Sequence, residues 1–203
     1  MTEIENEKLV PSQRRLQREP DFTGARLSSF REIALRHGLP GALLGVSCLA
    51  LPQMGTMLQA GLSQAADNPV RGVVVGVVIF AGLNLYAWYI DRTWGLEKAG
   101  WILYLGAVSA WEEWVFRVAL PQTAESMGMT LISAVVVSNL VFGAAHYFTL
   151  RWRWQWCLAA FIGGMGFSWN FAELHNLVLI IYIHWVVTFL NTPRLPGGSA
   201  SNL

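Results

Sequence analysis

Residues 72–90 read GVVVGVVIFAGLNLYAWYI, a run with no charged side chain. A helix needs about 20 predominantly apolar residues to cross the hydrocarbon core of a bilayer, and this run has that length. Comparable apolar stretches lie on both sides of it, at roughly 39–62, 99–120, 128–150, 155–171 and 174–191. The sequence therefore predicts an all-α fold, a polytopic transmembrane bundle of about six helices.

The composition supports lipid as the solvent of this chain. Of its 203 residues, 54% are hydrophobic and 13% are charged, whereas about a quarter are charged in an ordinary soluble domain. The net charge is +1, with no basic stripe of the kind that binds nucleic acid. We expect the bilayer to be a partner and nucleic acid not to be one. Cys48 and Cys157 lie in apolar stretches, where cysteine behaves as a small hydrophobe.

The basic residues predict how the bundle is oriented. With a cytoplasmic N-terminus, twelve of the fourteen Lys and Arg residues fall inside, Arg71 falls outside, and Arg117 lies within a span. This asymmetry follows the positive-inside rule and predicts that both termini are cytoplasmic. We divide the chain into a polar tail at 1–37 ending in an interfacial helix, a transmembrane domain at 38–192 and a short tail at 193–203. The stretch 151–156, RWRWQW, is interpreted as an interface anchor.

Three ionisable residues stand where none is expected, inside the stretch 99–120. Each costs at least about 2.5 kcal/mol at the centre of a membrane helix, so their presence needs a reason. Glu113 and Arg117 are four residues apart, share a helix face and can form an ion pair. Glu112 is rotated by about 100 degrees from Glu113, because an α-helix has 3.6 residues per turn. Glu112 is thus the carboxylate left available for chemistry.

Two histidines lie in later apolar stretches, His146 in 128–150 and His184 in 174–191. Buried polar groups of membrane proteins face the bundle interior, so we expect these residues and the two glutamates to share one pocket. A carboxylate and an imidazole can deprotonate a water, and a second imidazole can stabilise an oxyanion. A divalent metal held by Glu112, His146 and His184 is the alternative. His37 and His175 are interpreted as ordinary interface residues.

These residues fall into three short patterns in a fixed order. EExxxR spans Glu112 to Arg117, FxxxH spans Phe142 to His146, and a further histidine, His184, follows late in the chain. Together they resemble the motifs of the CAAX protease and bacteriocin-processing family of intramembrane endopeptidases, over roughly residues 99–191. The resemblance implies a membrane-embedded glutamate-type protease that needs no metal or other cofactor.

By that resemblance, Glu112 is the general base, His146 holds the same water, Glu113 and Arg117 organise the site, and His184 helps to form the oxyanion hole. The third motif of the family is usually HxxxN or HxxxD. Here the fourth residue after His184 is Thr188, which we expect to donate one hydrogen bond in place of the amide or acid, while Asn191 is further along the same face. Because of this departure, reduced activity relative to other members of the family is an alternative expectation.

The predicted function is cleavage of a membrane-associated peptide or protein substrate, in what we expect to be a bacterial inner membrane. Two other classes of protein remain open. A non-catalytic immunity or scaffold protein of the same family would keep the pocket for stability, and a proton-linked transporter would use buried Glu and His residues as a relay.

Overall fold

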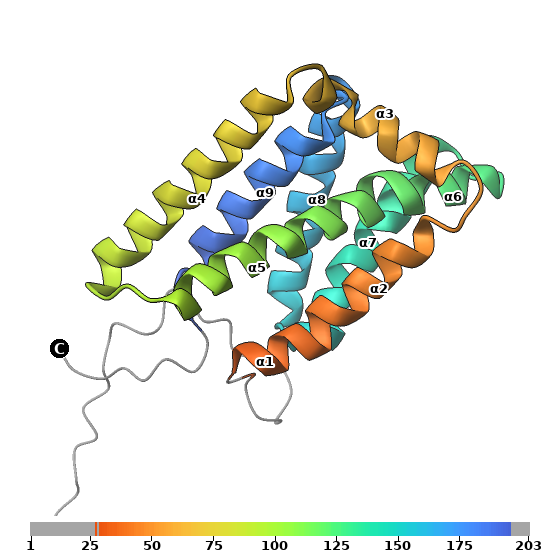
Figure 1. Cartoon of the computed structure of the whole chain (residues 1–203). Helices are drawn as coiled ribbons and strands as arrows, with labels where there is room; N and C mark the ends of the chain where they lie inside the picture. The colour runs from red at the N-terminus through yellow and green to blue at the C-terminus, as the bar shows by residue number, and fades with distance from the viewer. Residues whose placement is uncertain (1–26, 28, 196–203) are drawn as a thin grey trace, which may run out of the picture.

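A computed structural model describes residue 27 and residues 29–195, and within them the chain is helical with no β-strand. The long helices run beside one another, α4 (Pro69–Asp91) against α5 (Leu96–Glu113) and α9 (Leu177–Asn191), and α7 (Leu131–Leu150) against α8 (Trp154–Leu174) (Figure 1). The prediction of an all-α fold is confirmed. The predicted tail lies mostly outside the described residues.

The first predicted span, 39–62, is not one helix. It is divided into α2 (Leu39–Cys48) and α3 (Met54–Asp67). Pro52 lies in the break, and the next residue, Gln53, has a left-handed φ of 66°. Proline lacks the N–H that would continue the helix, and a non-glycine residue at positive φ leaves the helical path altogether. The stretch predicted as one span is therefore two helices with a full interruption between them.

The chain before α2 is also helical. A short α1 (Phe30–Ile33) leads through the π-helical turn η2 (Ala34–Gly38) directly into α2. Ser29 caps α1 by accepting the Glu32 N–H at 3.2 Å. The Phe30 ring packs edge-on against Trp101 and Tyr104 of α5, with centroids 5.4 and 5.0 Å apart. The N-terminal helical run is therefore docked along α5, although whether it also touches lipid headgroups stays a prediction.

A second π-helical turn interrupts the helix that carries the glutamates. α5 ends at Glu113 and continues without a loop through η3 (Trp114–Ala119) into α6 (Leu120–Ser126). A π turn inserts one extra residue per turn and is often found at functional sites. Every residue of η3 is buried. The glutamate pair thus lies at the point where the central helix widens.

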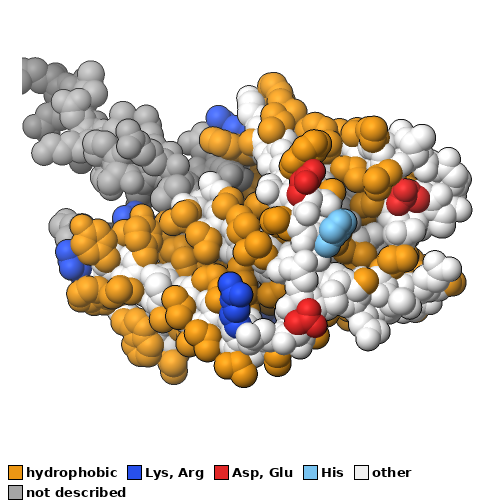
Figure 2. Space-filling model, turned by 90° about the horizontal axis from the view of Figure 1, so that it is seen from above, with side chains coloured by type: hydrophobic (Ala, Val, Ile, Leu, Met, Phe, Trp, Pro, Cys, Tyr) orange, Lys and Arg blue, Asp and Glu red, His pale blue; other side chains and the backbone are white. Residues whose placement is uncertain are grey.

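Two helices, α4 and α7, have the apolar surface expected of membrane-spanning helices. α4 and α7 are long and apolar enough to cross a bilayer. Of the most apolar 18-residue stretch of α4, only 11% is buried inside the protein. Figure 2 shows hydrophobic side chains over much of one face, with few charged groups among them. Soluble proteins rarely expose such large contiguous apolar surface.

Segments predicted to face the cytoplasm meet at one end of the bundle. Asp91, at the end of α4, accepts a hydrogen bond from Lys98 of α5 at 2.9 Å and lies 3.3 Å from Arg194, which follows α9. The Arg36 guanidinium bonds the carbonyls of Phe148 and Thr149 near the end of α7, both at 3.3 Å. A bundle of six spans and the side of the membrane that this end faces stay predictions.

Candidate active site

Five of the predicted site residues converge inside the bundle. Glu112 and Glu113 lie at the end of α5, Arg117 lies in η3, His146 in α7 and His184 in α9. All five are buried, and Glu113 has no exposed surface. The structure therefore brings together ionisable residues that the sequence separates by up to 72 positions, and it divides them into two parts built around the two glutamates.

The first part is a closed network around Glu113. Arg117 donates to both carboxylate oxygens of Glu113, from Nε at 2.9 Å and from the terminal nitrogen Nη2 at 3.3 Å. Its other terminal nitrogen donates to Asn139 Oδ1 at 2.6 Å. The guanidinium carbon also lies 4.9 Å from the centre of the Phe142 ring, within cation–π range. Each charge of the pair is thus compensated without water.

Helix α7 supplies the support for this network. The Asn139 amide donates to Ser168 Oγ of α8 and to the Val135 carbonyl, each at 2.9 Å. Gly164 of α8 lies directly over the pair, since a Cβ there would collide with Asn139 Oδ1. Only a glycine allows α8 this approach. The Glu113–Arg117 pair is held by three helices.

The second part surrounds Glu112 with three histidine rings. His37 Nε2 lies 3.1 Å from Glu112 Oε1, in hydrogen-bond contact. His146 Nε2 is 3.7 Å from the same oxygen, and His184 Nε2 is 3.7 Å from Oε2. A separation of 3.7 Å is too long for a direct hydrogen bond. Glu112 therefore has one oxygen that is hydrogen-bonded and a second, Oε2, that makes no direct hydrogen bond with the three rings.

His184 joins the two parts. Its Nδ1 lies 2.6 Å from Glu113 Oε1, although the ring does not point along the direction of a hydrogen bond. The ring also packs on Phe167 of α8, with centroids 5.0 Å apart. Since Nδ1 faces Glu113, Nε2 is the nitrogen directed toward Glu112 and toward anything bound beside it.

The orientation of His146 is fixed by its own helix and by one tryptophan. Its Nδ1 donates to the Phe142 carbonyl at 2.8 Å, because a carbonyl can only accept. This leaves Nε2 as the free nitrogen on the side of Glu112. The Trp152 indole covers the ring, with centroids 4.4 Å apart. The sequence assigned Trp152 only to the interface anchor, whereas the structure also places it against a site residue.

Thr188 is the predicted site residue that the structure does not connect to the others. It lies one turn after His184 on α9 and is half-buried. Its carbonyl accepts from Thr192 Oγ1 at 2.8 Å, and its hydroxyl has no hydrogen bond within the described part of the chain. Asn191 donates to the Val187 carbonyl of its own helix at 2.9 Å. Neither residue reaches the glutamates.

Sequence reasoning missed His37 and Asn139 as members of the cluster. His37 was interpreted as an interface residue, but it is 8% exposed and bonds Glu112. A signal existed, because His37, Gly41 and Gly45 recur at four-residue spacing and so share a face with two small residues. Asn139 lies seven residues before His146, two turns back on the same face.

Three side chains of the cluster lie close enough together to bind one cation. They are His37, Glu112 and His146, and their ligand atoms, two imidazole nitrogens and a carboxylate oxygen, lie within 4.8 Å of one another. The sequence named His184 as the third ligand, whereas the structure offers His37 in that position. Two imidazoles and a carboxylate form a donor set that zinc accepts. The donor set therefore fits a divalent metal.

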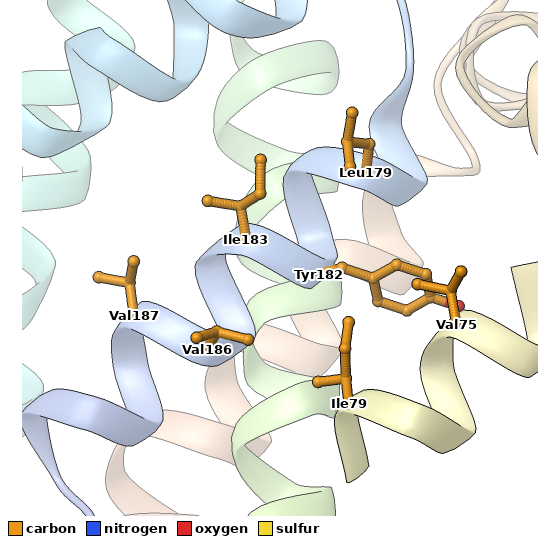
Figure 3. A pocket seen from close by; sticks show the side chains of 7 residues that line it. All are labelled: Val75, Ile79, Leu179, Tyr182, Ile183, Val186 and Val187. Carbon is orange, nitrogen blue, oxygen red and sulfur yellow. The ribbon is translucent and has the colours of Figure 1, made fainter. Parts of the chain in front are cut away.

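A separate apolar hollow lies away from this cluster, between α4 and α9. Figure 3 shows the Tyr182 side chain of α9 reaching toward Val75 of α4, with Ile79 below it. The Tyr182 hydroxyl donates to the Gly72 carbonyl at 2.8 Å, so its polar end is already satisfied. None of the residues of the buried cluster lines the hollow.

Comparison with known proteins agrees with the resemblance drawn from the motifs. Residues 94–190 match a family model described as type II CAAX prenyl endopeptidase Rce1-like. No curated protein and no solved structure matches the chain. The matched segment contains α5 to α8 and all but the last residue of α9, and with them the two glutamates, Arg117, His146 and His184. It excludes α1 to α4 and therefore His37.

Proposed function

We propose, from the match of residues 94–190 to the CAAX prenyl endopeptidase family model, that this chain is a glutamate-type intramembrane endopeptidase. The observation that carries the proposal is the contrast between the two glutamates. Glu113 is fully paired with Arg117, whereas Glu112 has one anchored oxygen and two imidazole nitrogens at 3.7 Å. Such a carboxylate is positioned to act on a small molecule placed between it and the histidines.

The reaction is hydrolysis of a peptide bond by one water. Glu112 takes one proton from the water, and the water oxygen bonds to the carbonyl carbon of the substrate. The other hydrogen stays on that oxygen and is donated as a hydrogen bond to His146 Nε2. His184 Nε2 donates to the oxygen that becomes negative. Glu112 then returns the proton to the amide nitrogen as the carbon–nitrogen bond breaks. Atoms and charges balance without a cofactor.

The proposed substrate is a membrane-associated peptide or protein whose scissile bond reaches the end of α7. His146 lies five residues before Arg151, which ends that helix in a left-handed conformation. In the predicted orientation this end faces the cytoplasm of a bacterial inner membrane. A substrate anchored in the same leaflet, such as a prenylated C-terminal peptide, would present its bond at the right depth.

The test compares cleavage by purified wild-type, Glu112→Gln and Glu97→Gln proteins in detergent. The probe is a farnesylated peptide ending in a CAAX sequence, with leader-type peptides alongside. Glu97 is an exposed glutamate at the start of the same helix and serves as the matched control. We expect Glu112→Gln to lower kcat by about 10²- to 10⁴-fold, the usual contribution of a general base, and Glu97→Gln to cleave normally.

Chelator and cellular assays give the other outcomes of this test. Cleavage that is abolished by a chelator and restored by zinc would replace the glutamate mechanism by a metal hydrolase built on the three donors described above. If no peptide is cleaved and the Glu112→Gln protein still functions in cells, the protein is a scaffold of this family. Proton flux through reconstituted vesicles that stops in the same variant would indicate a transporter.

A further inference from the structure

We propose that His37 is a positioning residue of the active site, which holds Glu112 through Nε2 and so makes the N-terminal helical run a necessary part of the catalytic centre. This inference rests on the proposed function. His37 lies outside the family-matched segment 94–190, in the turn η2. Its ring is the only one of the three histidine rings around Glu112, within the described residues, that is in direct hydrogen-bond contact with it.

The hydrogen bonds on the far side of the ring determine which nitrogen faces Glu112. His37 Nδ1 lies 2.8 Å from Thr149 Oγ1, and that hydroxyl donates its hydrogen to the Ala145 carbonyl at 2.7 Å. Since a hydroxyl has one hydrogen, Thr149 can only accept from His37. Thr149 therefore holds Nδ1, and this turns Nε2 toward Glu112.

This arrangement explains how Glu112 stays usable as a base. A carboxylate buried among apolar side chains is costly unless a charge and hydrogen bonds compensate it. Arg117 is already committed to Glu113 and Asn139, and His146 and His184 are not in bonding contact with Glu112. His37 supplies the missing hydrogen bond at Oε1, which fixes the direction of the carboxylate.

The helix that delivers His37 is built for close approach to α5. A Cβ on Gly38 would lie 2.8 Å from the Tyr104 ring, and one on Gly41 would overlap the Trp111 indole. Four residues later, the Gly45 carbonyl accepts from Trp114 Nε1 at 2.9 Å. These small residues form a docking face, as is common where membrane helices cross closely. Arg36 adds a second attachment, to the end of α7.

The experiment separates the two nitrogens of His37 by two conservative substitutions. The amide nitrogen of Gln lies near the position of Nε2 and can still donate to Glu112. The amide of Asn lies near Nδ1 and can reach only Thr149. We measure kcat and KM of His37→Gln, His37→Asn and His175→Gln on the farnesylated peptide, with the full-length protein in detergent. His175, an exposed loop residue, is the matched control.

We expect His37→Asn to lower kcat by about 10- to 100-fold, the value of one hydrogen bond to a charged group, with KM nearly unchanged. His37→Gln should recover most of that loss, and His175→Gln should behave as wild type. Thr149→Val, which removes the acceptor of Nδ1, should lower kcat by less than His37→Asn does. Equal activity of the Gln and Asn variants, at the wild-type level or at any lower one, would overturn the proposal.

An infrared measurement decides the same point if no peptide is cleaved. The difference spectrum between wild type and Glu112→Gln isolates the carboxylate bands of Glu112. We expect His37→Asn to shift these bands and His37→Gln to leave them nearly in place. Unshifted bands in His37→Asn would refute the hydrogen bond. Absence of cleavage with shifted bands would instead refute the proposed function and leave the role of His37 in holding Glu112 intact.

Discussion

Glu112 and Glu113 are neighbours in the chain and have opposite surroundings. Glu113 meets a guanidinium on both oxygens and is entirely enclosed. Glu112 meets three imidazoles and makes one hydrogen bond with them. Burial alone therefore does not identify a reactive group. A guanidinium compensates Glu113 at both oxygens, as expected of a structural ion pair, whereas the incomplete pairing of Glu112 supports its proposed role as the base.

The largest expected effect is the loss of stability when Glu113 loses its partner Arg117. Arg117→Ala leaves the Glu113 carboxylate buried without its cation, so the free energy of unfolding should fall by about 3–5 kcal/mol. Glu112→Gln keeps an amide that can bond His37, so its stability should change by about 1 kcal/mol or less. Thermal unfolding of the purified proteins in detergent measures both. Equal melting temperatures of Arg117→Ala and wild type would show that the Glu113–Arg117 pair is not a stabilising element.

A smaller effect is expected from two adjacent glycines of α8. A Cβ on Gly164 would collide with Asn139 Oδ1, whereas a Cβ on Gly163 meets nothing within 4 Å. Overpacking of this kind typically costs about 1–3 kcal/mol, so Gly164→Ala should unfold more readily than wild type. Gly163→Ala should be neutral or gain up to about 1 kcal/mol from helix propensity.

The two glycine variants serve as controls for each other, because the change is identical and the positions are consecutive. Their unfolding free energies come from the same detergent melts. If both alanine variants were equally stable, Gly164 would not be required for the approach of α8 to the Arg117–Asn139 contact.

The smallest expected effect concerns Thr188 of α9, which contacts neither glutamate. Its hydroxyl has no partner within the described residues, so Thr188→Val should lower kcat by no more than about threefold, less than a typical hydrogen bond contributes. Thr188→Asn, which introduces the residue usual in the family, should match or exceed wild type. A loss of a hundredfold or more in Thr188→Val would instead place this hydroxyl in contact with the reacting substrate.

Much of the fold followed from local properties of the chain. Apolar length predicted the helices at 72–90, 128–150 and 174–191, which the structure has as α4, α7 and α9. These predictions succeed because a long apolar run has few ways to satisfy its backbone other than a helix. The first span failed at Pro52 and Gln53, since apolar composition does not tell a kink from a complete break.

The site divides in the same way. The spacing of Glu113 and Arg117 predicts that they can pair, because helical spacing fixes which residues share a face. The sequence also contains, at Glu112, His146 and His184, the motifs that resemble those of the CAAX protease family. Only the tertiary structure brought His37 to Glu112 and Asn139 to Arg117. These contacts join residues 75 and 22 positions apart, and no local periodicity encodes which helices pack together or how closely. Gly38 and Gly41 decide that approach on one side and Gly164 on the other.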